Sequence, residues 1–389
     1  MRKAVIVDAV RTPGGKLRGQ LKDWHAVDLL AEVLKAVIER NNLAPEIIDD
    51  VIAGCVTQTG EQSANVGRNA VLAAGFPESV PATSIDRQCG SGQQAAHFAA
   101  QGVMAGAYDV VIAAGVESMT RVPMGIAMQQ GPGKPFGDRM IDRYEDGLVP
   151  QGISAELIAE EWDISREELD HLAYESHMRA TLATEEGRFD NEIIPIEVKN
   201  DDGSIELMSR DEGIRPSTTP EILSGLKPAF KTNGVITAGN SSQITDGAAA
   251  LLIMSEEKAK ELDLQPRARF HTFALAGVDP VMMLTGPIPA TKKVLTRAGL
   301  AISDIDLFEV NEAFSSVIAA WLRETGVNYE RLNVNGGAIA LGHPLGATGA
   351  KLMATLVNEL ERSGGRYGLQ TMCEGGGMAN ATIVERVAA

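Results

Sequence analysis

Cys89 and its neighbours have the residue types that nucleophilic catalysis needs. The thiol lies in the segment DRQCGSGQQA (Asp86–Ala95), where an extended stretch runs into small residues and then a helix pattern. At a helix N-terminus, free N–H groups and the positive end of the helix dipole favour a thiolate. The same N–H groups could stabilise an oxyanion beside the sulfur. The alternative interpretation is a buried structural cysteine.

His343 lies in a glycine-rich loop, NGGAIALGHPLGATG (Asn335–Gly349), that also precedes a helix pattern. Pro344 fixes the backbone after the ring, and the glycines allow unusual dihedral angles around it. This position suits a general base, although a lone histidine can equally be a satisfied core or surface residue. The other five histidines stand in ordinary helix, strand or turn contexts: His25, His97, His171, His177 and His271.

Cys373 and Asn311 each follow a predicted strand, Gly368–Met372 and Leu307–Val310. The three glycines after Cys373 could offer N–H donors to a ligand, or could simply form a turn between terminal strands. The Asn311 amide could hold a water or an oxygen atom, or cap the next helix. Because strand ends meet in a doubly wound sheet, we expect these groups to lie together with Cys89 and His343.

The elements that must position these groups alternate between strands and helices. Short β-branched runs at Val5–Val7, Asp50–Cys55 and Val110–Gly115 predict buried strands. Amphipathic or alanine-rich patterns predict helices at Asp28–Ile38 and Gln93–Ala105. This alternation favours a largely parallel sheet covered on both faces.

The chain contains an internal repeat. Asn42–Gly54 (NLAPEIIDDVIAG) parallels Gly299–Asn311 (GLAISDIDLFEVN), and both follow an amphipathic helix. Gly106–Ser118 parallels Gly365–Gly376, each after a helix that opens with a glycine-rich turn. These parallels predict two halves built on one plan.

The predicted organisation has three parts. The N-terminal half comprises residues 1–118 and 240–264, and the C-terminal half comprises residues 265–389. Residues 119–239 form an insertion of helices and loops over one face of the paired core. Long ordered segments of this kind are often functional.

Composition excludes several classes of protein. The 389 residues carry a net charge of −17, which argues against nucleic acid or an anionic membrane as partner. No apolar run reaches the roughly 18 residues of a membrane span, and the N-terminal run is too short for a signal peptide. Three cysteines cannot all pair, and their spacing matches no metal site, so free thiols in the cytoplasm are expected.

Together, these segments resemble the signature blocks of the thiolases, and most closely those of the degradative branch. The resemblance runs from Val5 to Arg386. It is carried by the Cys89 segment, NEAF (Asn311–Phe314), GHP (Gly342–Pro344) and CEGGG (Cys373–Gly377), with VIVDAVRTP (Val5–Pro13), GVESM (Gly115–Met119) and AGNSSQITDG (Ala238–Gly247) in support.

The resemblance implies a five-layer αβαβα fold from two similar halves, with the inserted loop domain over the active site. Cys89 would be the nucleophile that becomes an acyl-thioester, and His343 would take its proton. A water held by Asn311 would help His343 to polarise the substrate carbonyl. Cys373 would be the second acid and base, and the backbone N–H groups of Cys89 and Gly375 would form the other oxyanion site.

The resemblance also implies CoA as a co-substrate, with no permanently bound cofactor and no metal. Arg215 and Ser242 would lie near CoA, and Ala313 and Phe314 would border the substrate. Family members are dimers or tetramers, so a homodimer or homotetramer is expected. Some of the basic residues could gather near the CoA phosphates: Arg121, Lys134, Arg139, Arg143 and Lys227.

The implied activity is cleavage of a 3-oxoacyl-CoA by CoA into acetyl-CoA and a shortened acyl-CoA, in β-oxidation of fatty acids or side chains. The alternative is an acetyl-CoA C-acetyltransferase that makes or cleaves acetoacetyl-CoA. Two departures weaken that alternative. Gln151 stands where the biosynthetic branch usually carries Met, and the loop Gly131–Val149 is unlike that of the short-chain enzymes.

Two more remote alternatives fit less well. A β-ketoacyl synthase would need two histidines with its cysteine, where this chain has Asn311 and Cys373. A non-catalytic relative that binds CoA esters or lipids would lack one of the reactive groups, yet all four are present. Lys351 stands where a relative would more often carry Arg, and the sequence assigns it no function.

Overall fold

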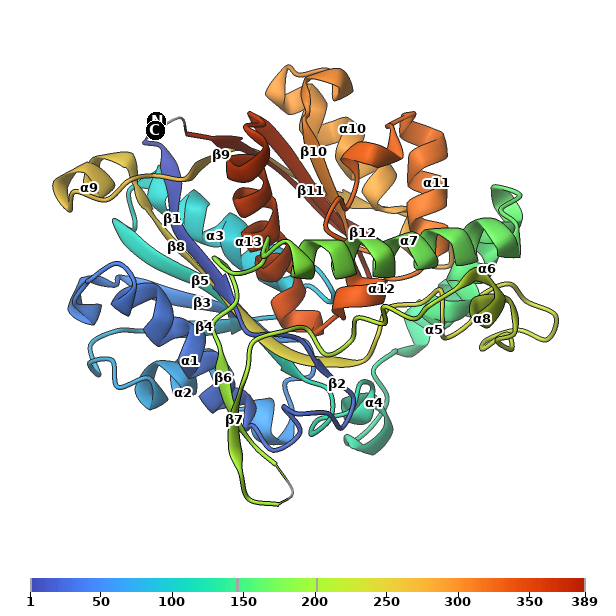
Figure 1. The fold of residues 1–389 in the computed structure, drawn as a ribbon, viewed down its shortest axis with the longest axis horizontal. Helices are drawn as coiled ribbons and strands as arrows, with labels where there is room; N and C mark the ends of the chain where they lie inside the picture. Colours follow the sequence, from blue (N-terminus) through green and yellow to red (C-terminus); the bar gives the residue numbers. More distant parts are fainter. Residues whose placement is uncertain (1, 145–146, 201, 388–389) are drawn as a thin grey trace.

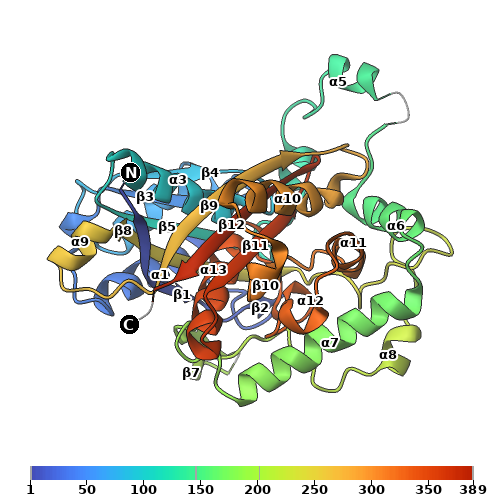
Figure 2. The same ribbon diagram turned by 90° about the horizontal axis from the view of Figure 1, so that it is seen from above.

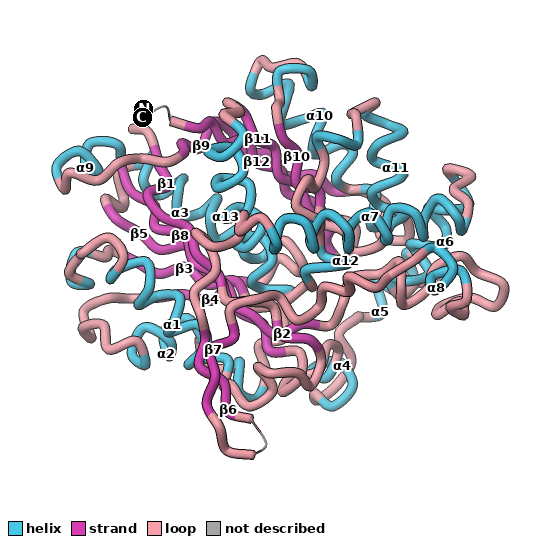
Figure 3. The backbone as a smooth tube through the Cα atoms, in the orientation of Figure 1, coloured by secondary structure: helices cyan, strands magenta, loops and turns pink. Residues whose placement is uncertain are grey.

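The computed structural model describes residues 2–144, 147–200 and 202–387. Within these ranges, ten strands form one sheet in the order β10-β11-β12-β9-β1-β8-β5-β3-β4, with β2 beside β8 (Figure 3). The strands of this sheet are β1 (Ala4–Arg11), β2 (Gly15–Lys16), β3 (Asp50–Gly54), β4 (Ala82–Ile85), β5 (Val110–Ser118), β8 (Thr245–Ser255), β9 (Ala268–Gly277), β10 (Leu307–Val310), β11 (Tyr367–Glu374) and β12 (Met378–Arg386).

The sheet consists of two halves joined at one short pairing. β1 and β9 share only two residue pairs, Val5 with Arg269 and Ile6 with Ala268. On one side of this junction lie β8, β5, β3 and β4, and on the other lie β12, β11 and β10. The chain therefore folds as two half-sheets that meet along their edges.

The prediction of a largely parallel sheet is wrong. Only the pairs β3–β4, β3–β5 and β10–β11 are parallel, and the strands between them run antiparallel. The turn from β11 to β12 has only three residues, which is too short for a parallel crossover. The sequence pattern was misleading because these strands are buried on both faces, which produces the same continuous apolar runs as a parallel sheet.

Helices cover both faces of each half-sheet. Alternate residues of β8 face two different cores: Leu252 packs with α1 and α2, whereas Leu251 packs with α3 and α13. The far half-sheet packs on α10 and α11 through a third core. These helices are α1 (Ala26–Glu39), α2 (Val66–Ala73), α3 (Ser91–Ala105), α10 (Pro287–Ala298), α11 (Ser315–Thr325) and α13 (Leu345–Ser363).

The order of layers is thus α1 and α2, the first half-sheet, α3 and α13, the second half-sheet, and α10 and α11 (Figures 1 and 2). This arrangement confirms the expected five-layer fold of two similar halves. The repeat is visible in the central layer, where α3 leads into β5 and α13 leads into β11. The first turns of α3 and α13 touch, since a Cβ atom at Gly92 would lie 2.8 Å from the Gly346 carbonyl oxygen, so the turns that precede the two helices lie at one end of that layer.

The segment between β5 and β8 contributes to two of these cores: Ile196 and Met208 pack with α1 and α2, and Ile158 packs with α10 and α11. It contains α4 (Ile126–Gln130), α5 (Asp138–Arg143), α6 (Gln151–Glu161), α7 (Arg166–Glu185), α8 (Pro220–Ser224) and the hairpin of β6 (Ile196–Lys199) and β7 (Ile205–Met208). Figure 2 shows α5 projecting away from the body of the molecule. The limits of the three predicted parts stay a prediction.

Two further short α-helices are α9 (Glu256–Glu261) after β8 and α12 (Ala338–Leu341) before α13. α12 lies within the predicted glycine-rich loop Asn335–Gly349, and its C-cap, Gly342, directly precedes His343. Of the helices in the described part of the chain, none is long and apolar enough to cross a membrane.

Candidate active site

Cys89 is presented by a tight turn between β4 and α3. Gln88, the residue before it, has a φ of 48°, which is unusual for a residue other than glycine. The Asp86 carboxylate accepts a hydrogen bond of 2.6 Å from the Gln88 N–H, and the Ser91 hydroxyl donates to the Gln88 carbonyl at 2.6 Å. Gly90 is the N-cap of α3, so the thiol lies just before the first turn of that helix.

The pKa of Cys89 is raised to about 11, mainly because the thiol is buried. The nearby Glu374 carboxyl also raises it, whereas hydrogen bonds from the Gln151 amide and from the backbone N–H groups of Gly375 and Cys89 lower it. Desolvation therefore outweighs the stabilisation that the helix N-terminus was expected to give the thiolate. A thiol in this state needs a neighbouring base to become a nucleophile.

Gln151 is the side chain from the inserted segment that reaches Cys89. It is the first residue of α6, and its Nε2 atom lies 4.0 Å from the Cys89 sulfur. A Cβ atom at Gly375 would lie 3.4 Å from the same Nε2 atom, so the amide stands beside both. The sequence singled out Gln151 only as a departure from the biosynthetic branch, and its contact with the thiol could not be predicted.

Cys373 lies near the end of β11, fully buried and paired with Ala379 of β12. Burial raises its pKa well above the usual value, and the charge of an ionised Cys89 raises it further. The two thiols are thus close enough to influence each other. Both are protonated at neutral pH, so Cys373 can act as a proton donor.

The hydrogen bonds of His343 define its tautomer. The Thr348 hydroxyl donates its only proton to the Pro344 carbonyl at 2.8 Å, so it must accept from His343 Nδ1, which lies 2.6 Å away. The proton is therefore on Nδ1, and the lone pair is on Nε2. The Nδ2 group of Asn311 lies 3.3 Å from Nε2. Burial lowers the pKa of His343 to about 3, so the ring is neutral and able to accept a proton.

Asn311 reaches His343 because β10 pairs with β11. Its backbone N–H donates to the carbonyl of Thr371 at 3.1 Å, two residues before Cys373. The next residue, Glu312, is buried and accepts hydrogen bonds from the Ser176 hydroxyl at 2.6 Å and the Ile339 N–H at 3.1 Å. These bonds hold the strand end against α7 and α12. In the described part of the chain, Asn311 Oδ1 is buried without a hydrogen-bond partner, so it can accept one from a ligand or water.

Ser242 and Ala313 lie together. The N–H of Ser242 donates to the Ala313 carbonyl at 2.9 Å, and Ser241 forms an isolated bridge with Phe314. One residue on, the Gln243 carbonyl accepts from the N–H of His343 at 3.2 Å. The segment around Ser242 therefore links the two strand-end motifs that carry Asn311 and His343.

Arg215 lies farther out. Its side chain is exposed, and its backbone N–H donates to His177 Nδ1 at 3.2 Å. A hydrogen bond two residues earlier links its segment to the site, because the Gln243 amide donates to the Gly213 carbonyl at 2.9 Å.

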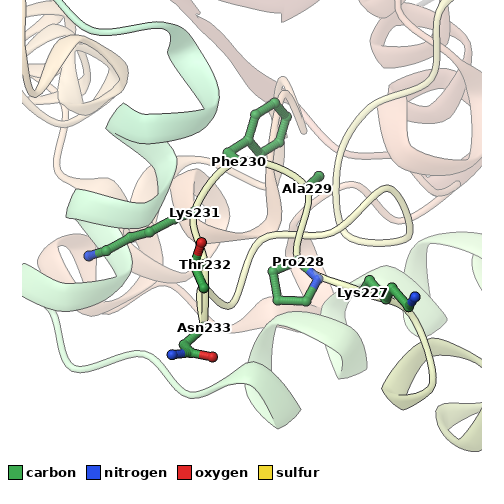
Figure 4. Close-up of a pocket in the computed structure, with 7 residues that line it drawn as sticks. All are labelled: Lys227, Pro228, Ala229, Phe230, Lys231, Thr232 and Asn233. Carbon is green, nitrogen blue, oxygen red and sulfur yellow. The ribbon is translucent and has the colours of Figure 1, made fainter.

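A pocket of about 430 Å³ is lined by residues 227–233, in the loop between α8 and β8 (Figure 4). In Figure 4, Phe230 and Lys227 point away from each other. The Phe230 ring meets Phe314 edge-on at 5.9 Å between centroids and also packs over Gly152. Phe230 thus joins the Phe314 region to the start of α6, where Gln151 approaches Cys89.

The structure does not gather the other basic candidates at one place. Arg121 is already engaged by two hydrogen bonds of 2.6 Å to Glu61. Lys134, Arg139 and Arg143 lie on the projecting segment around α5, whereas Lys227 lies on the pocket loop. Among the described residues, no group of His, Cys, Asp and Glu side chains has an arrangement that could hold a metal ion.

Comparisons with known proteins give one family for the whole chain. The family model for the thiolase N-terminal domain matches residues 4–257, and the one for the thiolase C-terminal domain matches residues 264–386. The steroid 3-ketoacyl-CoA thiolase of Mycobacterium tuberculosis is 49% identical over 100% of this chain and 95% of its own length. The 3-ketoacyl-CoA thiolase of Aliivibrio fischeri is 45% identical over 99% and 100%.

Two solved structures share the fold. The Bacillus anthracis acetyl-CoA acetyltransferase superposes with a TM-score of 0.91 and 41% identity, covering 100% of this chain and 99% of that one. The human mitochondrial 3-ketoacyl-CoA thiolase superposes with a TM-score of 0.91 and 39% identity, covering 99% of each chain.

Proposed function

The chain belongs to the thiolase family, and we propose that it cleaves 3-oxoacyl-CoA with CoA in β-oxidation. The products are acetyl-CoA and an acyl-CoA two carbons shorter. The observation that carries the proposal is two pairs of buried groups at the ends of repeated elements: the thiols of Cys89 and Cys373, of which the first, when ionised, raises the pKa of the second, and the neutral His343 ring, whose Nε2 atom lies 3.3 Å from the Asn311 amide. This set supplies a nucleophile, a base, an acid and oxyanion donors, as the reaction requires.

In the first half of the reaction, His343 Nε2 takes the proton of Cys89, and the sulfur attacks the 3-carbonyl of the substrate. The bond between C2 and C3 then breaks, leaving an acyl-thioester on Cys89 and the enolate of acetyl-CoA. Cys373 protonates that enolate at carbon. His343 and a water on Asn311 stabilise one oxyanion, and the N–H groups of Cys89 and Gly375 stabilise the other.

In the second half, the thiol of CoA gives its proton to the Cys373 thiolate and attacks the acyl-thioester. Cys89 leaves as a thiolate and recovers its proton from His343, so both thiols and the imidazole return to their starting states. The raised pKa values of the two thiols suit this cycle, because each must release a proton only when a base is in place. No redox step is needed.

CoA would enter past the inserted segment, which we propose as a loop domain of residues 119–239. Ser242 and Ala313 would border the pantetheine and the acyl group, together with Phe314, since their segments are bonded to one another beside His343. Arg215, whose side chain is exposed, would meet the nucleotide. CoA acts here as a substrate and leaves after each turnover.

A second candidate function is acetyl transfer between two acetyl-CoA molecules. It is favoured by the likeness to the B. anthracis protein, whose name is acetyl-CoA acetyltransferase. The same four groups run the reaction in reverse, so they do not distinguish the two functions. The difference lies in the space available to the acyl chain, which Phe230, Phe314 and Gln151 border.

A ladder of 3-oxoacyl-CoA substrates separates these functions. We expect kcat/KM for thiolysis to rise at least about tenfold from acetoacetyl-CoA to a long-chain or bulky cyclic substrate, because added apolar surface is bound in the pocket. The measurement is the loss of the 3-oxoacyl-CoA absorbance with purified protein and free CoA. Turnover of acetoacetyl-CoA alone would replace the proposal with the acetyltransferase, and turnover of none would refute both.

We also propose that the enzyme is a cytoplasmic homodimer or homotetramer. Its three cysteines are free, as expected in a reducing compartment. The segment that contains α4 and α5 exposes Met124, Met128, Phe136 and Ile141, a concentration of apolar side chains typical of a surface that another subunit covers. Light scattering after size exclusion should therefore give the mass of two or four chains. The mass of one chain would contradict this assignment.

A further inference from the structure

Lys351 is a buried lysine that the proposed mechanism does not use. It lies on α13, in the second turn after the His343 loop, and only 4% of its side chain is exposed. An ammonium group taken out of water is costly unless it is paired and hydrogen-bonded. The groups that Lys351 contacts therefore indicate which part of the structure its charge stabilises.

The first contacts of Lys351 lead directly to His343. Its Nζ atom donates to the carbonyl of Leu341 and reaches the carbonyl of Gly342 at 3.5 Å. Leu341 is the last residue of α12 and Gly342 is its C-cap, so these are carbonyls that a helix end leaves without partners. Gly342 also has a φ of 82° and packs against Thr245. The ammonium thus holds the two peptides that immediately precede the imidazole.

The other side of Lys351 faces a buried network of charges. Asp211 lies 4.0 Å from its Nζ atom. The Asp211 carboxylate accepts two hydrogen bonds from Arg11, at 2.8 and 2.9 Å, and Arg11 donates a third to Glu192 at 2.6 Å. The charged and titratable groups around Lys351 are therefore Asp211, Arg11, Glu192 and His343.

The charge of Lys351 acts on the histidine as well. After burial, it is the Lys351 ammonium that lowers the pKa of His343. Burial lowers the pKa of Lys351 itself to about 8, against the opposing effect of Asp211, so most of the side chains carry a proton at neutral pH. A cation fixed beside the imidazole disfavours a second positive charge on the ring.

We propose that Lys351 is a positioning residue for His343: it holds the Leu341 and Gly342 carbonyls so that Nε2 faces Asn311, and its charge sets how readily the ring takes a proton. The inference rests on the proposed function, in which His343 is the base. This proposal gives a role to Lys351, which the sequence marked as a departure from the family pattern without assigning it a function.

Three variants test the two parts of this role. Lys351→Gln keeps a donor and removes the charge, Lys351→Met removes both, and Lys351→Arg keeps both. The matched control is Lys293→Met, since Lys293 also donates to a backbone carbonyl, that of Leu275 at 2.7 Å, but is exposed on α10. Circular dichroism shows whether each variant is folded.

Without the cation, the pKa of His343 should rise, so the protonated, inactive ring should persist to higher pH. We expect the acidic limb of kcat/KM against pH to move up by roughly one unit in Lys351→Gln and Lys351→Met. Lys351→Met should also lose about 10²-fold in kcat/KM at neutral pH, because the base is no longer held in place. Lys351→Arg should restore the wild-type limb, and Lys293→Met should leave it unchanged.

Titration of ring-labelled histidine by NMR follows His343 without requiring turnover. A rise in its pKa in Lys351→Gln supports the inference, and an unchanged pKa with an unchanged acidic limb overturns it, whatever happens to the rate. If wild-type protein shows no thiolysis, the proposed function fails, while the NMR titration still tests the coupling of Lys351 to His343. If Lys351→Met does not fold, the comparison of Lys351→Gln with Lys351→Arg decides the result.

Discussion

Replacing Cys89 with serine should reduce thiolysis by roughly 10³-fold or more and should abolish the acyl-enzyme. The serine hydroxyl is a far weaker nucleophile than a thiolate at neutral pH, and His343 would have to remove a much less acidic proton. Mixing the variant with a 3-oxoacyl-CoA in the absence of CoA, followed by intact-protein mass spectrometry, measures the adduct directly. Wild-type protein should gain the mass of one acyl group.

Cys55→Ser is the matched control for Cys89→Ser. Cys55 is also a free, buried cysteine, but it belongs to the outer core that packs with α1 and α2. It should keep the acyl adduct and most of the activity. An adduct of normal yield in Cys89→Ser, mapped by peptide analysis to another residue, would refute the assignment of the nucleophile.

Replacing Cys373 with serine should separate the two chemical steps. We expect thiolysis to fall by roughly 10²- to 10⁴-fold, the usual contribution of a positioned general acid. Acyl transfer from acetyl-CoA to Cys89 breaks no carbon–carbon bond, so the acetyl adduct on Cys89 should remain. The raised pKa of Cys373 supports this role, because a thiol that stays protonated is ready to donate to the enolate.

Exchange of the acetyl-CoA methyl hydrogens with deuterated water isolates the Cys373 step, since it needs only removal and return of a proton at that carbon. Wild-type protein should exchange them, and Cys373→Ser should not. Loss of the acetyl adduct in Cys373→Ser, with exchange intact, would mean that the roles of the two thiols are reversed.

Local sequence patterns were sufficient for the elements that carry the site. The turn before Cys89 and the glycine-rich loop around His343 each depend on residues that are only a few positions apart in the sequence. Both could therefore be predicted without knowing the rest of the fold. Asn311 was predicted in the same way, from its place after β10, whereas Cys373, predicted to follow its strand, lies inside β11 near the end. The direction of strand pairing could not be predicted from the sequence, because burial on both faces removes the alternation of apolar and polar residues that distinguishes antiparallel sheets.

Some contacts of the site had no local signal. Gln151 is 62 residues from Cys89 along the chain, and it reaches the thiol only because α6 lies over the core. Lys351 acquires its surroundings from Asp211 and Arg11, which belong to the inserted segment and to the first strand. A departure from a family pattern marked both residues, but could not say what either one contacts.

The sequence by itself determined which reactive groups the protein has, the turns that present them and the repeat that pairs α3 with α13. Only the tertiary structure decided their protonation. Cys89 is a thiol rather than a thiolate, and His343 is neutral with its proton on Nδ1, because desolvation and hydrogen bonding arise from atoms that distant segments bring together. Residue type sets the ordinary pKa of a group, and its buried surroundings set the value at which it works.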